Sequence, residues 1–277
     1  MKEMTWASFL SCVACVLIVA YAAFGIPYIE YCKAVSLQKD GKIIEAYDAY
    51  IALGDYKDSK EKAASLYEQY KAEKFRNAAV GDFIFLGTYD QDNDALNGKE
   101  DIQWLVLAIE DGKALVTSRY GLACMQYHTR DEKVTWENCT LRAWLNEVFW
   151  ESVFSAEEQE KILTTTVPVD KKSVNTEDQG DPTEDKLFIL SALELETYLK
   201  IPEDRTCRAT KSAVFDGADV SDTTGCGWYW TRTSGRYSDE VLTVDSNGNI
   251  GTFGDDVAET YSLVRPAMWV DLKERDH

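Results

Sequence analysis

The feature that most constrains this chain is a long run without charged residues near its start, from Met4 to Ile29. A helix of about 20 apolar residues spans the hydrocarbon core of a bilayer, and this run is longer. Trp6 and Tyr28 lie near its two ends, where amphipathic rings favour the headgroup layer. The run therefore predicts a transmembrane signal anchor over residues 1–27, which contacts the membrane through residues 5–27.

Three other interpretations of this run are weaker. A signal peptide cut after Ala22 fits the small residues Ala20 and Ala22, but the run stays apolar beyond that point, which favours an uncut anchor. A lipid-modified cysteine at Cys12 or Cys15 is a poor match, because the residues before each do not form a lipobox. A buried soluble helix is least favoured, because such helices are rarely apolar on every side.

The orientation of the anchor decides on which side of the membrane the rest of the chain lies. Lys33, Lys39 and Lys42 follow the run, and the positive-inside tendency would keep them in the cytoplasm. A very short N-terminal tail before a large domain is nevertheless the usual layout of a signal anchor that exports its domain. We therefore expect a single-pass protein of the cell membrane with an extracellular C-terminal domain.

The composition excludes several classes of protein. Apolar residues make up 45% and aromatic residues 12% of the 277 residues, which is enough for a packed core. The formal net charge of −19 repels phosphate backbones, so we expect no nucleic-acid partner. The seven cysteines and the two histidines, His128 and His277, lack the clustered spacing that zinc needs. We expect neither a metal nor a cofactor, and a disulfide between Cys207 and Cys226 only if the domain lies outside the cell.

Residues 28–76 show helical patterns. Gly41 and Gly54 are placed to end two helices, and Asp58 or Ser59 is placed to cap a third. Apolar residues recur at helical spacing in the second and third helices: Ile44, Tyr47, Ile51 and Leu53, then Ala63, Leu66, Tyr67 and Tyr70. The pattern resembles the tetratricopeptide-like hairpins of exported Gram-positive proteins, but a solenoid needs about three repeats and this segment holds fewer. We expect a helical hairpin stalk that acts as a spacer, with partner binding by the stalk as the alternative.

Residues 77–277 begin with strand patterns. Apolar residues predict strands over 83–89 and 102–110. The turn signal Asp111-Gly112 predicts that the second of these forms a hairpin with the strand that follows.

Helical patterns occupy the middle of this region. A strongly amphipathic helix is expected after Asn138, its cap, with inward-facing residues at helical spacing: Leu141, Trp144, Leu145, Val148 and Phe149. Two capping boxes predict further short helices: Ser155 with Glu158, and Ser191 with Glu194. Pro202 is expected to end the second of these.

Strand patterns return near the end of the chain, at 228–233, 240–245, 250–253 and 262–272. The turn signal Asn247-Gly248 predicts a hairpin between the second and third of them. Strands, two main helices and strands again, without βαβ repetition, predict an α+β domain with a mixed, mainly antiparallel sheet. We expect the first strand, near Phe83, and the last, near Trp269, to share that sheet.

One combination of segments carries a resemblance to a known family. It consists of VGDFIFLGTY, IQWLVL, TLRAWLNEVFW, KLFILSALELE, WYWTRTSG and LVRPAMWV. Together these resemble an uncharacterised domain of Gram-positive bacterial surface proteins, over nearly all of residues 79–272. That domain is similar to the C-type-lectin-like fold of formylglycine-generating enzymes, so the resemblance implies that fold and a surface location, but no reaction. The segment Trp230-Thr231-Arg232-Thr233 departs from the family's usual W-L-R-S, so no finer role is transferred to it.

The aromatic segment GWYWTRTSG, residues 227–235, is the strongest candidate for a site. On a strand, Trp230 and Arg232 point to one face, and we expect both to be structural, with a buried acceptor for Arg232. The opposite face and the loop after Gly235 offer aromatic rings, a cation and an acceptor. We expect these to contact an extracellular glycan or peptide through Tyr229, Arg236, Tyr237 and Asp239.

No set of residues predicts catalysis. His128 has no identifiable partners for a catalytic triad. The first three alternating ligands of an EF-hand are matched by Asp90, Asp92 and Asp94. Ala95 nevertheless replaces the EF-hand glycine and Asp101 replaces its glutamate, so this segment is interpreted as a hairpin loop.

These patterns lead to one expected function and two alternatives. We expect a membrane-anchored surface protein whose C-type-lectin-like head, residues 77–277, binds a ligand without catalysis. The first alternative is a copper-dependent oxidase related to formylglycine-generating enzymes, which would need Cys207 and Cys226 to converge. The second is a structural envelope component that acts through the stalk, residues 28–76.

Overall fold

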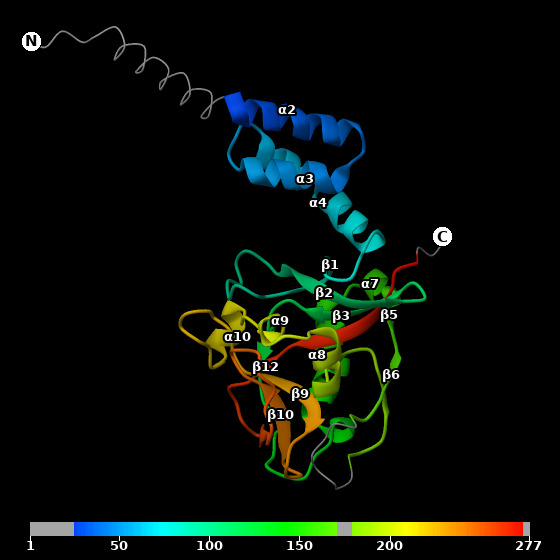
Figure 1. Ribbon diagram of the computed structural model, residues 1–277, viewed down its shortest axis with the longest axis vertical. Coiled ribbons are helices and arrows are strands. Elements are labelled where there is room, and N and C mark those ends of the chain that lie inside the picture. Colours follow the sequence, from blue (N-terminus) through cyan, green and yellow to red (C-terminus); the bar gives the residue numbers. More distant parts are fainter. Residues whose placement is uncertain (1–24, 171–178, 274–277) are drawn as a thin grey trace, which may run out of the picture. The chain divides into compact units, whose positions relative to one another are not determined.

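The computed structural model describes residues 25–170 and 179–273. It divides the chain into two compact units, Met1–Asn77 and Ala78–His277 (Figure 1). Most of the expected membrane-spanning segment, residues 5–27, lies outside the described residues. Among the helices that are described, none combines the length and the apolar character that a bilayer crossing requires.

Between residues 25 and 77, the described part of the first unit forms three helices, α2 (Ile26–Lys39), α3 (Ile43–Leu53) and α4 (Ser59–Arg76). Gly41 and Gly54 follow the first two helices with φ angles of 73° and 55°, a left-handed conformation that glycine adopts without strain. The predicted helices and their glycine stops are therefore confirmed.

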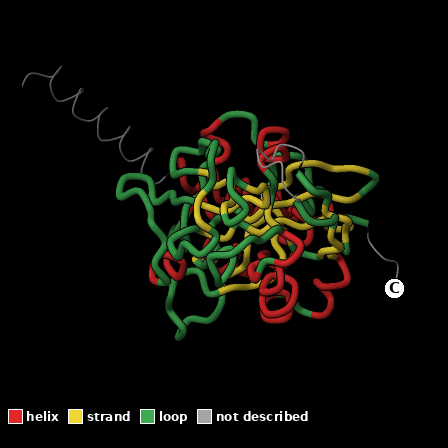
Figure 2. Tube along the Cα trace, turned by 90° about the horizontal axis from the view of Figure 1, so that it is seen from below, coloured by secondary structure: helices red, strands yellow, loops and turns green. Residues whose placement is uncertain are grey.

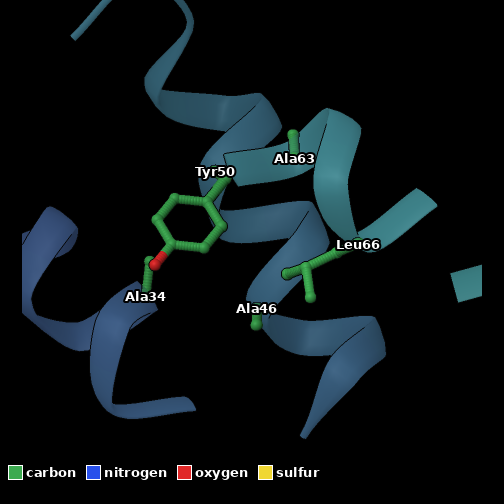
Figure 3. Close-up of a cluster of buried hydrophobic side chains, with 5 residues drawn as sticks. All are labelled: Ala34, Ala46, Tyr50, Ala63 and Leu66. Atoms are coloured by element: carbon green, nitrogen blue, oxygen red, sulfur yellow. The ribbon is translucent and has the colours of Figure 1, made fainter. Parts of the chain in front are cut away.

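Small side chains bring the three helices close together around one tyrosine. The buried residues are Ala34, Ala46, Tyr50, Ala63 and Leu66 (Figure 3). The Tyr50 hydroxyl donates a hydrogen bond of 2.9 Å to Oε1 of Gln38, which satisfies its polar end. Ile51, which was expected on the inward face, is exposed instead, because Ala46 and Tyr50 define the buried side of α3.

The first sheet of the second unit joins the beginning and the end of that unit. Its path is β1-β2-β3-β13-β5, and β8 also pairs with β13. The strands are β1 (Phe83–Tyr89), β2 (Glu100–Glu110), β3 (Lys113–Ser118), β5 (Ile162–Leu163), β8 (Phe188–Ile189) and β13 (Pro266–Asp271). Asp111 and Gly112 both have positive φ angles in the tight turn between β2 and β3, as the turn signal predicted.

A second sheet and a small ribbon complete the strands of this unit. The second sheet has the order β11-β10-β9-β12-β4; β9 and β12 are parallel, and the other described pairs of this sheet are antiparallel. Its strands are β4 (Ala123–Cys124), β9 (Tyr229–Ser234), β10 (Glu240–Val244), β11 (Asp255–Asp256) and β12 (Leu263–Val264). The ribbon pairs β6 (Thr165–Val167) with β7 (Thr183–Asp185). The α+β class with mainly antiparallel sheets is confirmed, and Figure 2 shows the strands gathered together with loops around them.

The expected amphipathic helix is broken into several turns. It consists of η2 (Trp136–Asn138), α5 (Thr140–Trp144), the π-helical stretch η3 (Leu145–Phe149) and α6 (Trp150–Val153). Leu141, Leu145 and Phe149 are buried as predicted, but Val148 is exposed. Val148 lies within the π-helical stretch, whose wider turn departs from the α-helical spacing on which the prediction was based.

The helix caps follow the sequence in part. Both capping boxes are present, at the starts of α7 (Ala156–Lys161) and α8 (Ala192–Tyr198). Asn138 does not cap α5, because the Cys139 sulfur accepts the hydrogen bond from the Arg142 amide instead. Pro202 begins the short helix α9 (Pro202–Arg205), and α10 (Lys211–Phe215) follows.

Candidate functional site

Strand β9 carries most of the aromatic segment and is buried on both of its faces. It lies between β10 and β12, and every residue from Tyr229 to Thr233 is buried. Trp230 is in the core, where its indole Nε1 donates a hydrogen bond of 2.8 Å to the Met125 carbonyl, so its predicted structural role is confirmed. The Tyr229 side chain is only 2% exposed and its hydroxyl donates to the Arg205 carbonyl at 2.8 Å. The expectation that Tyr229 contacts a ligand is wrong, because both faces of this central strand are covered.

Arg232 has the buried acceptors that its charge demands. Its Nη2 donates to Oε1 of Glu194 at 2.7 Å, and its Nη1 donates to Oε2 of Glu194 and, at 3.0 Å, to the Ile189 carbonyl. This forked pairing matches the planar geometry of a guanidinium to that of a carboxylate. Its Nε–H, in contrast, is buried and has no acceptor among the described residues.

The loop after β9 carries a cation close to two exposed aromatic rings. Tyr237 is 58% exposed and Phe253 is 61% exposed. The Arg236 guanidinium lies 5.5 Å from the centroid of the first ring and 5.8 Å from that of the second. Asp239, the last of the expected ligand residues, is half-buried in the same loop, where its carbonyl accepts from the Val257 amide.

Phe253 is the one member of this cluster that the sequence analysis missed. It was expected in a strand over 250–253, but that stretch makes only a single bridge, between Val244 and Ile250. The chain instead returns so that the Phe253 carbonyl accepts from the Arg236 amide. We call the surface formed by Arg236, Tyr237 and Phe253 the aromatic loop.

A pocket adjoins the end of β9. Its cavity volume is about 10 Å³, and its lining includes Trp136, Val167, Asp170, Asp181, Arg232 and Ser234. Ser234 lines the pocket and Arg236 belongs to the aromatic loop. These residues are two positions apart, and their Cα atoms are therefore separated by at most about 7 Å. The pocket and the aromatic loop are thus neighbours on the surface.

Three carboxylates converge in the loop between β1 and β2. Oxygens of Asp90, Asp92 and Glu100 lie within 4.8 Å of one another, whereas Asp94, the third expected ligand of an EF-hand, is not part of the cluster. The carboxylates accept hydrogen bonds from their own loop, as in the 2.7 Å bond from the Gln91 amide to Glu100. These bonds are those of a polar hairpin loop, and the cluster by itself identifies no ion.

Cys207 and Cys226 lie on adjacent segments and are both reduced and buried. The Gly227 amide donates to the Cys207 carbonyl at 3.0 Å, which fixes the pairing of the two segments. Burial raises the pKa of the Cys207 thiol to about 11, although the nearby Arg265 guanidinium opposes the shift. Nucleophilic cysteines act as thiolates, and burial disfavours that form of Cys207.

His128 is engaged by both of its ring nitrogens. Its Nε2 lies 3.2 Å from Oε1 of Glu132, and its Nδ1 accepts from the Thr140 amide at 3.2 Å. Neither nitrogen is left to activate a hydroxyl or a thiol.

Comparison with known proteins gives one match. A family model described as a domain of unknown function (DUF6273) matches residues 111–272, which include β9, the pocket and the aromatic loop. Neither the curated proteins nor the solved structures contain a match. The chain therefore belongs to the DUF6273 family.

Proposed function

We propose that this chain is a membrane-anchored surface protein whose head, residues 77–277, binds a ligand and catalyses no reaction. The observation that carries the proposal is the aromatic loop, in which the exposed Tyr237 and Phe253 rings both lie near the Arg236 guanidinium. Large aromatic rings are usually buried, and exposed clusters of them mark binding surfaces. A cation and two ring faces together suit a ligand with polar and apolar parts, such as a glycan or a peptide.

The anchor and the stalk support a location at the cell surface. The uncharged run from Met4 to Ile29 has the length of a membrane-spanning helix. The helices of residues 28–76 would then separate the head from the membrane as a spacer. In this arrangement the head is extracellular, where it meets its ligand.

We further infer a C-type-lectin-like fold and a Gram-positive surface protein as its setting. The inference rests on the six segments that resemble this group of proteins. It is supported by a sheet in which β13, the last strand, pairs with β3 of the opening hairpin.

Two observations favour binding over catalysis. Burial raises the pKa of the Cys207 thiol to about 11, which disfavours a free thiolate nucleophile at this position. His128 is already held by Glu132 and by the Thr140 amide. The head thus offers exposed recognition groups but no activated nucleophile at either position.

The proposal is tested with the full-length protein in lipid nanodiscs, applied to glycan and peptide arrays. Replacing Tyr237 and Phe253 by alanine together is expected to weaken binding of every ligand found by about tenfold or more, as loss of aromatic anchors does at other interfaces. Phe215→Ala is the matched control, because that ring is 75% exposed on α10, outside the aromatic loop. The proposal would be overturned if the folded wild-type protein bound nothing on either array. It would also be overturned if Phe215→Ala weakened binding as much as the double variant does.

A further inference from the structure

The ribbon of β6 and β7 leaves one strand edge open. Thr165, Thr166 and Val167 pair with Asp185, Glu184 and Thr183, and no third strand joins this sheet in the described parts of the chain. Figure 1 shows β6 at the margin of its unit. In an antiparallel pair, alternate residues direct their N–H and C=O groups away from the partner strand. An edge of this kind is a template for a further strand.

The other strand of the ribbon, β7, is held by hydrogen bonds to the broken helix. Asp185 on β7 accepts hydrogen bonds from Nε1 of Trp136 at 2.9 Å and from Nε of Arg142 at 2.7 Å. The amides of Lys186 and Leu187 donate to Oδ1 of Asn146. These bonds tie β7 to the broken helix and leave β6 as the outer strand.

One of the residues that line the pocket at the end of β6 has a buried donor without an acceptor. Val167, the last residue of β6, lines the pocket together with Arg232. The Arg232 side chain is only 3% exposed, and both of its terminal nitrogens are taken by Glu194 and the Ile189 carbonyl. Its Nε–H is buried and has no acceptor among the described residues, and such a donor is costly. A carbonyl oxygen seated in the pocket would supply that acceptor.

Among the described residues, carboxylates outnumber cations around the pocket. The Arg232 charge is balanced by Glu194, whereas the exposed Asp181 carboxylate has no hydrogen bond or ion pair to any described residue. Asp170 adds a second carboxylate to the lining, and Glu184 is exposed on the neighbouring β7. A net charge of −19 over the chain strengthens this local field. The pocket therefore favours a cationic side chain.

We propose that the free edge of β6 and this pocket together bind an extended peptide segment that carries a lysine or an arginine. The peptide backbone pairs with β6, one of its carbonyls accepts from Arg232 Nε, and its basic side chain pairs with Asp181. A strand edge presents donors and acceptors at the spacing of a peptide backbone, which a glycan does not match. The inference rests on the proposed ligand-binding function and narrows its ligand to one class.

The test uses the full-length protein in nanodiscs and an array of random decapeptides, followed by titration of the best binder in solution. Binders are expected to be enriched in lysine and arginine. Asp181→Asn should weaken such a peptide by up to about fivefold, the size of an exposed ion pair, and should not affect the same peptide with its basic residue replaced by norleucine. Asp222→Asn is the control, because Asp222 is an exposed carboxylate elsewhere on the head. N-methylation of alternate peptide amides should abolish binding, since it removes the backbone donors that pair with β6.

Each other outcome overturns a defined part of this inference. If Asp181→Asn and Asp222→Asn weakened peptide binding equally, the overall charge of the head and not Asp181 would explain the effect. If N-methylated peptides still bound, pairing of the peptide with β6 would be excluded. Binding to glycans with no peptide enriched would refute the peptide site and leave the ligand-binding function standing. Binding to neither class would refute both.

Discussion

The ion pair between Arg232 and Glu194 gives the sharpest test of how the central strand β9 is held in place. We consider Glu194→Gln, which keeps the shape of the side chain and removes its charge. The change leaves the guanidinium of Arg232 buried without a counter-ion and turns an amide donor toward its N–H groups. It also weakens the capping box of α8, in which the Glu194 carboxylate accepts from the Ser191 amide at 2.8 Å.

The magnitude follows from the burial of the two partners. Removing one partner of a fully buried ion pair destabilises a protein by about 3–5 kcal/mol. The Arg232 side chain is 3% exposed, but that of Glu194 is 24% exposed, so water replaces part of the lost interaction. We therefore expect Glu194→Gln to lower the free energy of unfolding by about 2–4 kcal/mol, including a contribution from the weakened cap.

Urea denaturation of the full-length protein, followed by tryptophan fluorescence, measures this loss. Glu203→Gln is the matched control, because Glu203 is exposed at the start of α9 and should change stability by less than about 0.5 kcal/mol. The double variant Arg232→Met/Glu194→Gln should lose less than the sum of the two single variants, since neither residue is then left unpaired. A loss below about 1 kcal/mol for Glu194→Gln, or additive losses in the cycle, would refute the reasoning.

Two further predictions concern a glycine contact and the cysteines. Gly248→Ala should lower the free energy of unfolding by more than about 2 kcal/mol, because φ is +83° and the new Cβ would lie 1.8 Å from the Pro202 carbonyl oxygen. Gly217→Ala shares the positive φ without a nearby atom, so urea denaturation should show a distinctly smaller loss, and equal losses would contradict the contact. Cys139 should resist N-ethylmaleimide at pH 8 while exposed Cys32 reacts, because burial raises the Cys139 pKa to about 12 and leaves on the order of one thiolate in ten thousand. Equal labelling of the two in the native protein, measured by mass spectrometry, would contradict that burial.

Local signals predicted the parts of the fold that depend on neighbouring residues. The capping box of Ser155 and Glu158, the turn at Asp111-Gly112 and the helix stop at Gly41 all occur where the sequence places them. Each depends on groups within about four residues of one another, so no distant part of the chain can change it.

Features set by distant contacts were predicted less well. Alternation along β9 separates its two faces, but it does not reveal that other elements cover both, so it wrongly favours Tyr229 as a ligand contact. The exposure of Val148 depends on a π turn, for which the helical spacing of apolar residues gives no signal. Both differences come from tertiary packing overriding a correct local pattern.

The candidate site shows the same division. The need of Arg232 for a buried acceptor follows from its charge, whereas the identity of Glu194 depends on a contact between residues 38 positions apart. The aromatic loop was predicted through Arg236 and Tyr237, but Phe253 joins it only because the chain folds back beside β10. The pocket could not be predicted, because its lining comes from several separate segments.

The most direct test of a surface-exposed, ligand-binding head is the accessibility of the C-terminus in intact cells. The full-length protein carries an epitope tag after His277 and is produced in a Gram-positive host, which has no outer membrane to exclude a protease. We expect added protease to remove the tag from intact cells while a cytoplasmic control protein stays whole. A tag that survives until the cells are lysed would place the head inside the cell and contradict the proposed function.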